Sequence, residues 1–452
     1  MISCLSFYLI CAYLCTAFGT PTESFGGKHV IVAGDFGQLP PPGAGGHYPL
    51  YSDSVGVWST EMSPKAQMSV IGQAIWHQFT TVVILRKNMR QAGLSEEDQR
   101  YRKALENARM KACDADDIAL LRSRIVGLTH SSPVLHPPGR EPVSIITALN
   151  SHRDSINSVG SKAFAQAMGI DLIEFHSVDS WAADEDQDST RATQRVHAST
   201  VNPRRSSNRI GKEMQELLWS LSPCLTGHHA GVLKLCQGMP VLLKKNEATE
   251  LCATNGAEGV VVGWDSHVID DSKEVLDTLF VRLSNPPREI QLADLPVNVI
   301  PLLRTKQRIN CTLPFSDKSS VFISREQVMI LPNFAMTDFA SQGRTRTFNP
   351  CHLAYCRSSQ SLYTCLSRSS SLRGLVILEG FDSFKLSGGL DHALKHCTSA
   401  IAAYRNWKGP DRSVQAGGLQ ASPRRSQSQQ ARLHLPNANE ESKKHTLSHS
   451  TM

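Results

Sequence analysis

Residues 29–41 read HVIVAGDFGQLPP. The apolar, β-branched run at 29–33 predicts a buried parallel strand that stops at Gly34. Asp35 and Gln38 follow at the carboxyl end of that strand, where open α/β sheets bind their ligands. A glutamine at this point can orient water or contact a terminal phosphate. An ordinary polar turn accounts for the same residues equally well, so the stretch predicts a sheet and leaves its chemistry open.

The same strand pattern recurs along the chain. Buried strands are expected at 81–85 (TVVIL), 143–147 (VSIIT) and 374–378 (GLVIL). Ser95 and Asp114 are expected to cap two helices, and further helices are expected after residue 147 and over 208–219.

A β-rich segment interrupts this alternation. Between about 232 and 331 the runs become short and β-branched, with Asn255-Gly256 as a turn, which is typical of a small barrel or sandwich. Strands alternating with helices around such a segment predict an α/β fold with an inserted all-β module. The polar stretch 182–207 reads as a loop, and 403–452 as a disordered tail.

The amino-acid composition limits the classes of partner and site that the chain can have. The 452 residues are 40% apolar, carry a net charge of +6 and have a pI near 8.7, which permits a polyanionic partner without requiring one. None of the twelve cysteines forms a CxxC pair, so we expect reduced thiols and no metal site. The apolar first nineteen residues imitate a secretory signal but lack a basic leading region and a clean cleavage site, and are interpreted as a buried helix. No membrane span is expected.

Three further segments have residues suited to binding phosphates. In LRKNMRQ (85–91), Arg90 can reach a phosphate, although a solvated basic turn is the alternative. AMTDFASQGRT (335–345) is rich in small donors that can hold nucleic-acid phosphates, or it is simply a capped helix start. QSLYTCLSRS (360–369) is expected to form a helix presenting Arg368, which can also be a plain surface charge.

Together these segments resemble the superfamily-one DNA helicases of the Pif type (petite integration frequency), including helicase-like proteins associated with Helitron transposons. GDFGQLPP resembles motif III, NMRQ motif IV, TDFASQGRT motif V and YTCLSRS motif VI. The resemblance covers about residues 1 to 395.

The resemblance implies a 5′-to-3′ DNA motor of two RecA-like domains that clamp ATP and Mg²⁺ and move single-stranded DNA or open DNA forks. It implies a nucleotide contact for each of Asp35, Gln38, Arg90, Gly343 and Arg368, with Gln38 sensing the γ-phosphate and the two arginines acting as catalytic fingers. It implies DNA contacts for Thr337, Ser341, Gln342 and Thr345. Relatives are linked to telomere maintenance, repair, recombination and transposition, in the nucleus or mitochondrion. The oligomeric state stays open.

The resemblance also implies a domain division. Residues 1–48 would belong to a first RecA-like domain, 49–231 and 332–402 to a second, and 232–331 to an SH3-like insert, with 403–452 as the tail.

One expected motif is missing. No G-x-x-x-x-G-K-[ST] phosphate loop occurs, because Gly27-Lys28 and Gly211-Lys212 lack the first glycine and the hydroxyl residue. Met1-Ile2-Ser3 resembles the residues that follow the metal-binding Asp-Glu of motif II, so Met1 is interpreted as an internal family methionine. We therefore expect the chain to be inactive alone. A non-catalytic single-stranded DNA-binding remnant is the alternative, and a secreted protein is a third possibility.

Overall fold

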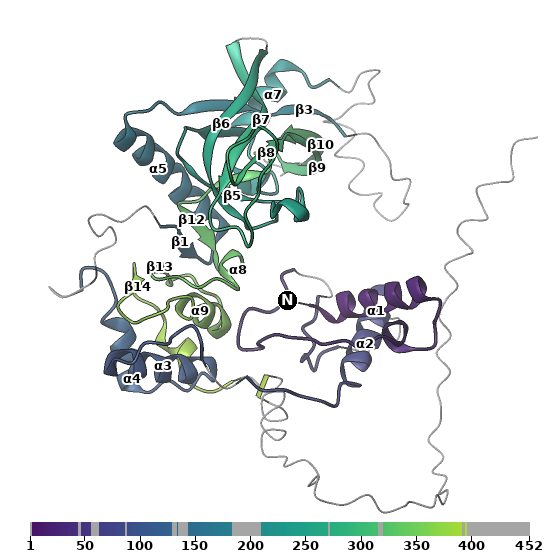
Figure 1. The fold of residues 1–452 in the computed structure, drawn as a ribbon, viewed down its shortest axis with the longest axis vertical. Coiled ribbons are helices and arrows are strands. Elements are labelled where there is room, and N and C mark those ends of the chain that lie inside the picture. The colour runs from purple at the N-terminus through teal and green to yellow at the C-terminus, as the bar shows by residue number, and fades with distance from the viewer. Residues whose placement is uncertain are drawn as a thin grey trace, which may run out of the picture. The chain divides into compact units, whose positions relative to one another are not determined.

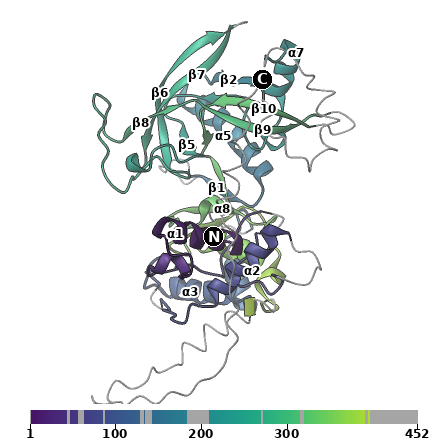
Figure 2. The same ribbon diagram turned by 90° about the vertical axis from the view of Figure 1, so that its right-hand side faces the viewer.

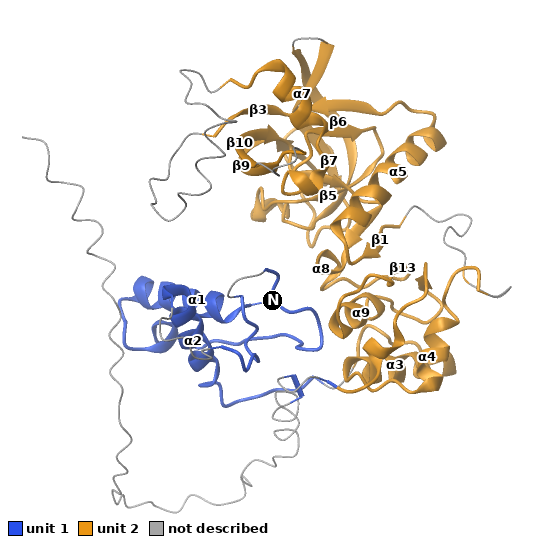
Figure 3. Ribbon diagram, turned by 180° about the vertical axis from the view of Figure 1, so that it is seen from behind, with its two compact units in different colours: residues 1–87, 390–452 blue, residues 88–389 orange. Residues whose placement is uncertain are grey.

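The computed structural model describes residues 2–43, 47–55, 63–85, 88–128, 133, 143–182, 209–269, 272–314, 320–390 and 394–395. They form two compact units (Figure 3), the first from Met1–Lys87 with Leu390–Met452 and the second from Asn88–Gly389. The finer division by motif stays a prediction. Most of the polar stretch and the tail lie outside the described residues.

The first unit is built on two packed helices, α1 (Cys4–Phe18) and α2 (Pro64–Trp76), with a 3₁₀ turn η1 (Ser24–Gly27). Ser3 caps α1 by accepting a hydrogen bond from the backbone of Ser6. A core of Cys4, Phe7, Cys11, Cys15, Phe25 and Ile75 joins the helices.

The close approach of these helices depends on Gly72. A Cβ there would lie 1.9 Å from the carbonyl oxygen of Cys4, so no side chain fits. The expected buried helix at the N-terminus is confirmed as α1. None of the described helices is both long and apolar enough to cross a membrane.

Two strand predictions are wrong. Residues 29–33 and 81–85 form no strand, and Ile31, Val83 and Leu85 are 95%, 82% and 91% exposed. Val30 and Val32 do pack against the α1–α2 core, so alternate side chains of the first segment face inward. A parallel strand needs a hydrogen-bonded neighbour, and the described part of this unit supplies none.

The second unit contains a parallel sheet in the order β12-β1-β13-β14 (Figure 1). Its strands are β1 (Ile145–Thr147), β12 (Ala335–Thr337), β13 (Asn349–His352) and β14 (Leu375–Ile377). The strands expected at 143–147 and 374–378 are therefore confirmed as β1 and β14.

Helices cover both faces of this sheet. On one face α3 (Glu96–Arg109), α4 (Ala115–Arg122) and α9 (Ser359–Leu366) share a core with Ile146, Met336 and Cys351. The caps expected at Ser95 and Asp114 are confirmed, since each accepts from the backbone three residues on.

The opposite face is covered by α5 (Asn150–Met168). Asn157 of this helix holds the entry to β12, because its Oδ1 accepts from the backbone N–H of Phe334 at 3.0 Å and of Ala335 at 2.7 Å. The resulting order of helix, sheet and helix is a layered α/β arrangement.

Between α5 and β12 the chain builds a β-rich part of two sheets. The larger sheet has the order β11-β5-β6-β7-β2-β4, with β8 paired to β7. Its strands are β2 (Ile173–His176), β4 (Val232–Leu235), β5 (Pro240–Leu243), β6 (Glu258–Ile269), β7 (Lys273–Leu283), β8 (Val299–Leu303) and β11 (Ile330–Pro332). Figure 2 shows β6 and β7 running together as a long pair.

The smaller sheet has the order β3-β10-β9, from β3 (Val178–Trp181), β9 (Thr305–Thr312) and β10 (Ser320–Gln327). Helix α7 (Lys212–Ser220) packs on it through Leu218. Because β2 and β3 pair with later strands, the β-rich part begins at Ile173, well before the predicted start near 232.

Candidate functional site

The motif IV segment (Asn88–Gln91) is bound to the motif V segment (Thr337–Thr345) and the motif VI segment (Tyr363–Ser369). Arg90 makes the central contact. Its Nε donates to Thr345 Oγ1 at 2.9 Å and its Nη1 to the Ser367 carbonyl at 3.1 Å. Three segments that are far apart in the sequence therefore meet at one half-buried guanidinium.

Gln91 fixes the same junction from inside. It is buried, and its Nε2 donates to the carbonyls of Ser367 at 3.2 Å and Ser369 at 2.6 Å. Arg102 of α3 in turn donates to the Gln91 carbonyl at 2.7 Å. The loop that carries Arg90 is thus held by hydrogen bonds on both sides.

The motif V segment starts at the carboxyl end of β12 and forms a single short turn, α8 (Asp338–Ser341). Thr337 caps it by accepting from the Ala340 N–H at 3.3 Å. Ser341 is fully buried and donates to the Asp338 carbonyl at 2.7 Å. The helix-start interpretation of this segment is therefore confirmed.

After α8 the segment turns to the surface. Gly343 adopts a φ of +81°, a left-handed conformation that favours glycine. Gln342 is half-buried and Thr345 is exposed. Of the predicted DNA contacts, these two side chains are open to a ligand, whereas Ser341 is not.

Arg344 connects motif V to the β-rich part. Its Nη1 lies 2.6 Å from Glu258 Oε1 at the start of β6, and its Nη2 donates to the carbonyl of Gly256 in the predicted Asn255-Gly256 turn. Its Nε also donates to the Ala340 carbonyl at 3.0 Å. The inserted module and the motif V turn are therefore joined by a charged pair.

Arg368 differs from its prediction. It follows α9, but its side chain is fully buried, with Nε donating to the Thr364 carbonyl at 2.9 Å and Nη2 to Ser367 Oγ at 2.8 Å. The expected helix is confirmed, whereas the expected presentation of Arg368 is wrong. The guanidinium satisfies buried acceptors of its own turn, so it does not project outward.

A buried carboxylate lies behind the motif V turn. Asp338 Oδ2 accepts from Ser361 Oγ of α9 at 2.5 Å, and Oδ1 accepts from the Phe339 N–H at 2.9 Å. Burial raises the pKa of Asp338, and these hydrogen bonds oppose the rise. This carboxylate positions α8 against α9.

The motif III residues lie in the first unit. Asp35 Oδ1 accepts from the Gly37 N–H at 2.9 Å, and its Oδ2 accepts from Gln38 Nε2 at 3.3 Å. Asp35 thus orients the Gln38 amide within one turn.

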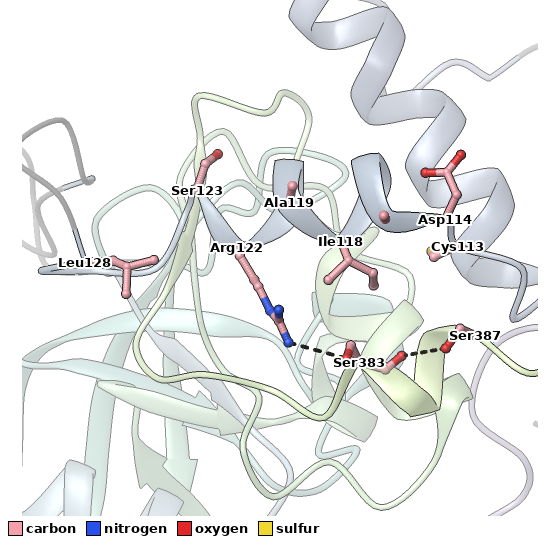
Figure 4. Close-up of a pocket in the computed structure, with 10 residues that line it drawn as sticks. Cys113, Asp114, Ile118, Ala119, Arg122, Ser123, Leu128, Ser383 and Ser387 are labelled. Carbon is pink, nitrogen blue, oxygen red and sulfur yellow. Dashed lines mark hydrogen bonds between the residues drawn. The ribbon is translucent and has the colours of Figure 1, made fainter.

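The structure also holds an open groove of about 640 Å³ between α4 and η5 (Ser383–Leu386), shown in Figure 4. Arg122 donates to Ser383 Oγ across it at 3.4 Å. None of the predicted site residues lines this groove. Within the described ranges, no group of three or more His, Cys, Asp or Glu side chains is placed to hold a metal ion.

The structure brings together Arg90, Thr345 and the backbone around Arg368, as the motif pattern suggests. It adds Gln91, Arg344 and Asp338, which sequence reasoning did not select as site residues. Gln91 is part of the quoted NMRQ, but its contacts are with carbonyl groups more than 270 residues away. Such contacts leave no mark in local sequence spacing.

No family model matches the chain. Over 358 residues the sequence is 23% identical to the ATP-dependent DNA helicase PIF1 of Rattus norvegicus, covering 79% of this chain and 42% of the relative. The Homo sapiens protein of the same name is 23% identical over 357 residues. The chain thus spans about two fifths of the length of these relatives.

Solved structures give the same picture of the fold. Pif1 helicase from Candida albicans matches with a TM-score of 0.56 and 17% identity, covering 89% of this chain and 75% of that one. Pif1 helicase from Bacteroides, solved in complex with ADP-AlF3 and ssDNA, matches with a TM-score of 0.57 and 19% identity. The match covers 89% of this chain and 73% of that one. The expected RecA-like α/β fold is confirmed.

Proposed function

We propose that this chain, a relative of the Pif1-type superfamily-one helicases in sequence and fold, is the strand-gripping part of an ATP-dependent 5′-to-3′ DNA helicase. The observation that carries the proposal is the junction of motifs IV, V and VI at Arg90. The family resemblance implies that the motif V turn around Gly343 transmits the state of the nucleotide to the DNA strand. The junction supplies the physical link that this transmission needs.

Within the proposal, Gln342 and Thr345 contact the phosphates of single-stranded DNA or of a fork, together with Thr337 and the turn at Gly343. Ser341 supports the turn from inside. Phosphate contacts of this kind are independent of base sequence and weaken steeply as salt rises. The net charge of +6 is compatible with such a negatively charged partner.

The residues proposed to contact the nucleotide differ in how accessible their side chains are to a phosphate. The half-buried Arg90 contacts a phosphate with the part of its guanidinium that stays open to solvent. Gln38, whose amide Asp35 orients, contacts a phosphate as well. Arg368 reaches a phosphate only after its guanidinium leaves Thr364 and Ser367. Its role therefore requires a rearrangement of the motif VI turn, whereas that of Arg90 does not.

The residues present do not fit a site for Mg²⁺-ATP of their own. The sequence has no phosphate loop, and the described residues place no metal-ligand cluster. We propose that this chain alone binds single-stranded DNA without turnover. Its place of action would be where DNA is held, in the nucleus or the mitochondrion.

Fluorescence anisotropy of a labelled dT oligonucleotide tests the binding. We expect binding at low salt, with log K falling against log salt by roughly 0.7 per phosphate contacted. Gln342→Ala should weaken it several-fold, and Gln99→Ala on the exposed side of α3 should not. No binding by the wild-type chain at low salt would contradict the proposal.

ATP hydrolysis is the second readout. With saturating oligonucleotide, the purified chain should release no phosphate above a no-protein blank. DNA-stimulated turnover at about 1 s⁻¹ or faster, the lower end of ordinary enzymes, would show that the chain is a complete motor.

A further inference from the structure

Three aromatic rings cluster beside the parallel sheet, outside the motif junction. His152 comes from the first turn of α5, His352 is the last residue of β13, and Tyr355 follows it. The two imidazoles are stacked, with centroids 5.2 Å apart and 21° between planes. Tyr355 meets both at steep angles, at 4.5 Å from His152 and 5.4 Å from His352.

The cluster lies at the carboxyl edge of the sheet. Thr337, Thr147 and His352 are register partners, and each is the last residue of its strand. With strands about 4.8 Å apart, Thr337 and His352 lie roughly 10 Å from one another along one edge. The rings are therefore next to the start of motif V, on the edge where α/β sheets receive ligands.

The outer ring of the cluster is open. Tyr355 is 51% exposed, although its ring contacts both imidazoles. His352 has a polar partner of its own, because its Nε2 lies 3.3 Å from Glu379 Oε2. A tyrosine that served only to close the core would be buried like Tyr101, which is 0% exposed.

The polar atoms of this edge are only partly satisfied. Thr147 Oγ1 and His152 Nδ1 are buried, and among the described residues neither has a hydrogen-bond partner. The edge therefore combines an exposed aromatic ring with buried polar atoms that have no partner among the described residues. The exposed ring offers a π surface on which a flat aromatic ligand can stack.

We propose that His152, His352 and Tyr355 form a platform on which one base of a single-stranded nucleic acid stacks, beside the phosphates held by motif V. This inference rests on the proposed function, since it needs the strand to cross this edge. Stacking on an aromatic face tolerates any base, because every base presents a π surface. A motor that translocates along arbitrary sequence requires such tolerance.

The test compares two labelled oligonucleotides of equal length by anisotropy, one of dT and one entirely abasic. Tyr355→Ala should weaken binding of dT about five-fold to 150-fold, the range for losing one stacked base. Binding of the abasic strand should be unchanged. Tyr355→Phe keeps the ring and should bind both strands like the wild type.

Tyr13→Ala removes a tyrosine that is 70% exposed on α1 and serves as the matched control. Equal losses on dT and abasic strands, or no loss on dT, would overturn the platform while leaving strand binding intact. Failure of the wild-type chain to bind either strand would overturn both the platform and the proposed function. A loss confined to dT, restored by phenylalanine, supports the platform.

Discussion

Arg90 Nε donates a hydrogen bond to Thr345 Oγ1 at 2.9 Å across a separation of 255 residues. The same guanidinium binds the Ser367 carbonyl, so one side chain joins the loops that carry motifs IV, V and VI. A change in the position of Arg90 must therefore move both other loops or break a hydrogen bond. Within the proposed function, Arg90 is the residue through which a bound phosphate would act on the strand contacts.

Replacing Arg90 by lysine should loosen this junction. Lysine has no planar fork and cannot reach both acceptors, so about 1 kcal/mol of hydrogen bonding is lost locally. Hydrogen exchange should become about five-fold faster at the amides of Arg346 and Ser370, which bond the two loops together. Arg100→Lys on the exposed side of α3 is the control, and equal exchange in both variants would rule out the coupling.

The β-rich part depends on a buried ion pair. Arg325 donates to both carboxylate oxygens of Asp179, at 2.9 Å and 2.7 Å, and both side chains are buried. Arg325→Met alone should lower the free energy of unfolding by about 3–5 kcal/mol, because it leaves a buried carboxylate unpaired. Denaturant unfolding followed by the fluorescence of Trp181, in the same strand as Asp179, measures this.

Adding Asp179→Leu to Arg325→Met should recover most of that loss, since no charge is then buried. The exposed pair Lys234–Glu174 gives the contrast, and Lys234→Met should cost less than about 1 kcal/mol. Similar costs for the two single methionine variants would argue against a special role for the buried pair.

We expect self-association through residues 29–33 and 81–85, which are apolar and have no sheet partner in the described part of the chain. Ile31 and Val83 are almost fully exposed on backbone that has no sheet partner. Ile31→Lys with Val83→Lys should shift the sedimentation profile toward the monomer at the same concentration. Val159→Lys, an exposed valine on α5, should leave the profile unchanged. Persistent aggregation of the double variant would place the cause elsewhere.

Acid stability should depend on His229. Burial first, and the nearby charges of Lys244 and Arg325, lower the pKa of His229 from 6.5 to about 4. Below pH 6.5 the unfolded chain takes up a proton that the folded chain refuses until about pH 4. The free energy of unfolding should therefore fall as the pH drops through this window.

His229→Gln should flatten that dependence between pH 7 and pH 5, measured by denaturant midpoints. A parallel measurement at pH 8, where the histidine is neutral in both states, reports the cost of the substitution itself. An unchanged slope in the variant would show that other groups carry the acid sensitivity. His176 and His228, whose pKa values burial also lowers, are the next to replace.

Local sequence signals predicted local structure well. Ser95 and Asp114 cap their helices as expected because an N-cap needs only a side-chain oxygen and a backbone N–H three residues away. Asn255-Gly256 forms its turn because Gly256 adopts a φ of +88°, which glycine reaches without a steric penalty. The strands at 143–147 and 374–378 form because both find parallel neighbours in the sheet.

The sequence by itself determined the α/β class, the presence of a β-rich insert and the positions of the motif segments along the chain, since each is encoded in short-range pattern. Tertiary structure alone decided that 29–33 and 81–85 stay unpaired, that β2 and β3 join the insert, and that Arg368 lies buried. A strand needs hydrogen bonds from a neighbouring strand, and a buried guanidinium needs hydrogen-bond acceptors. Distant parts of the chain must supply both. Segments with the same apolar, β-branched pattern can therefore form a strand or stay exposed to solvent, depending on what the rest of the fold places beside them.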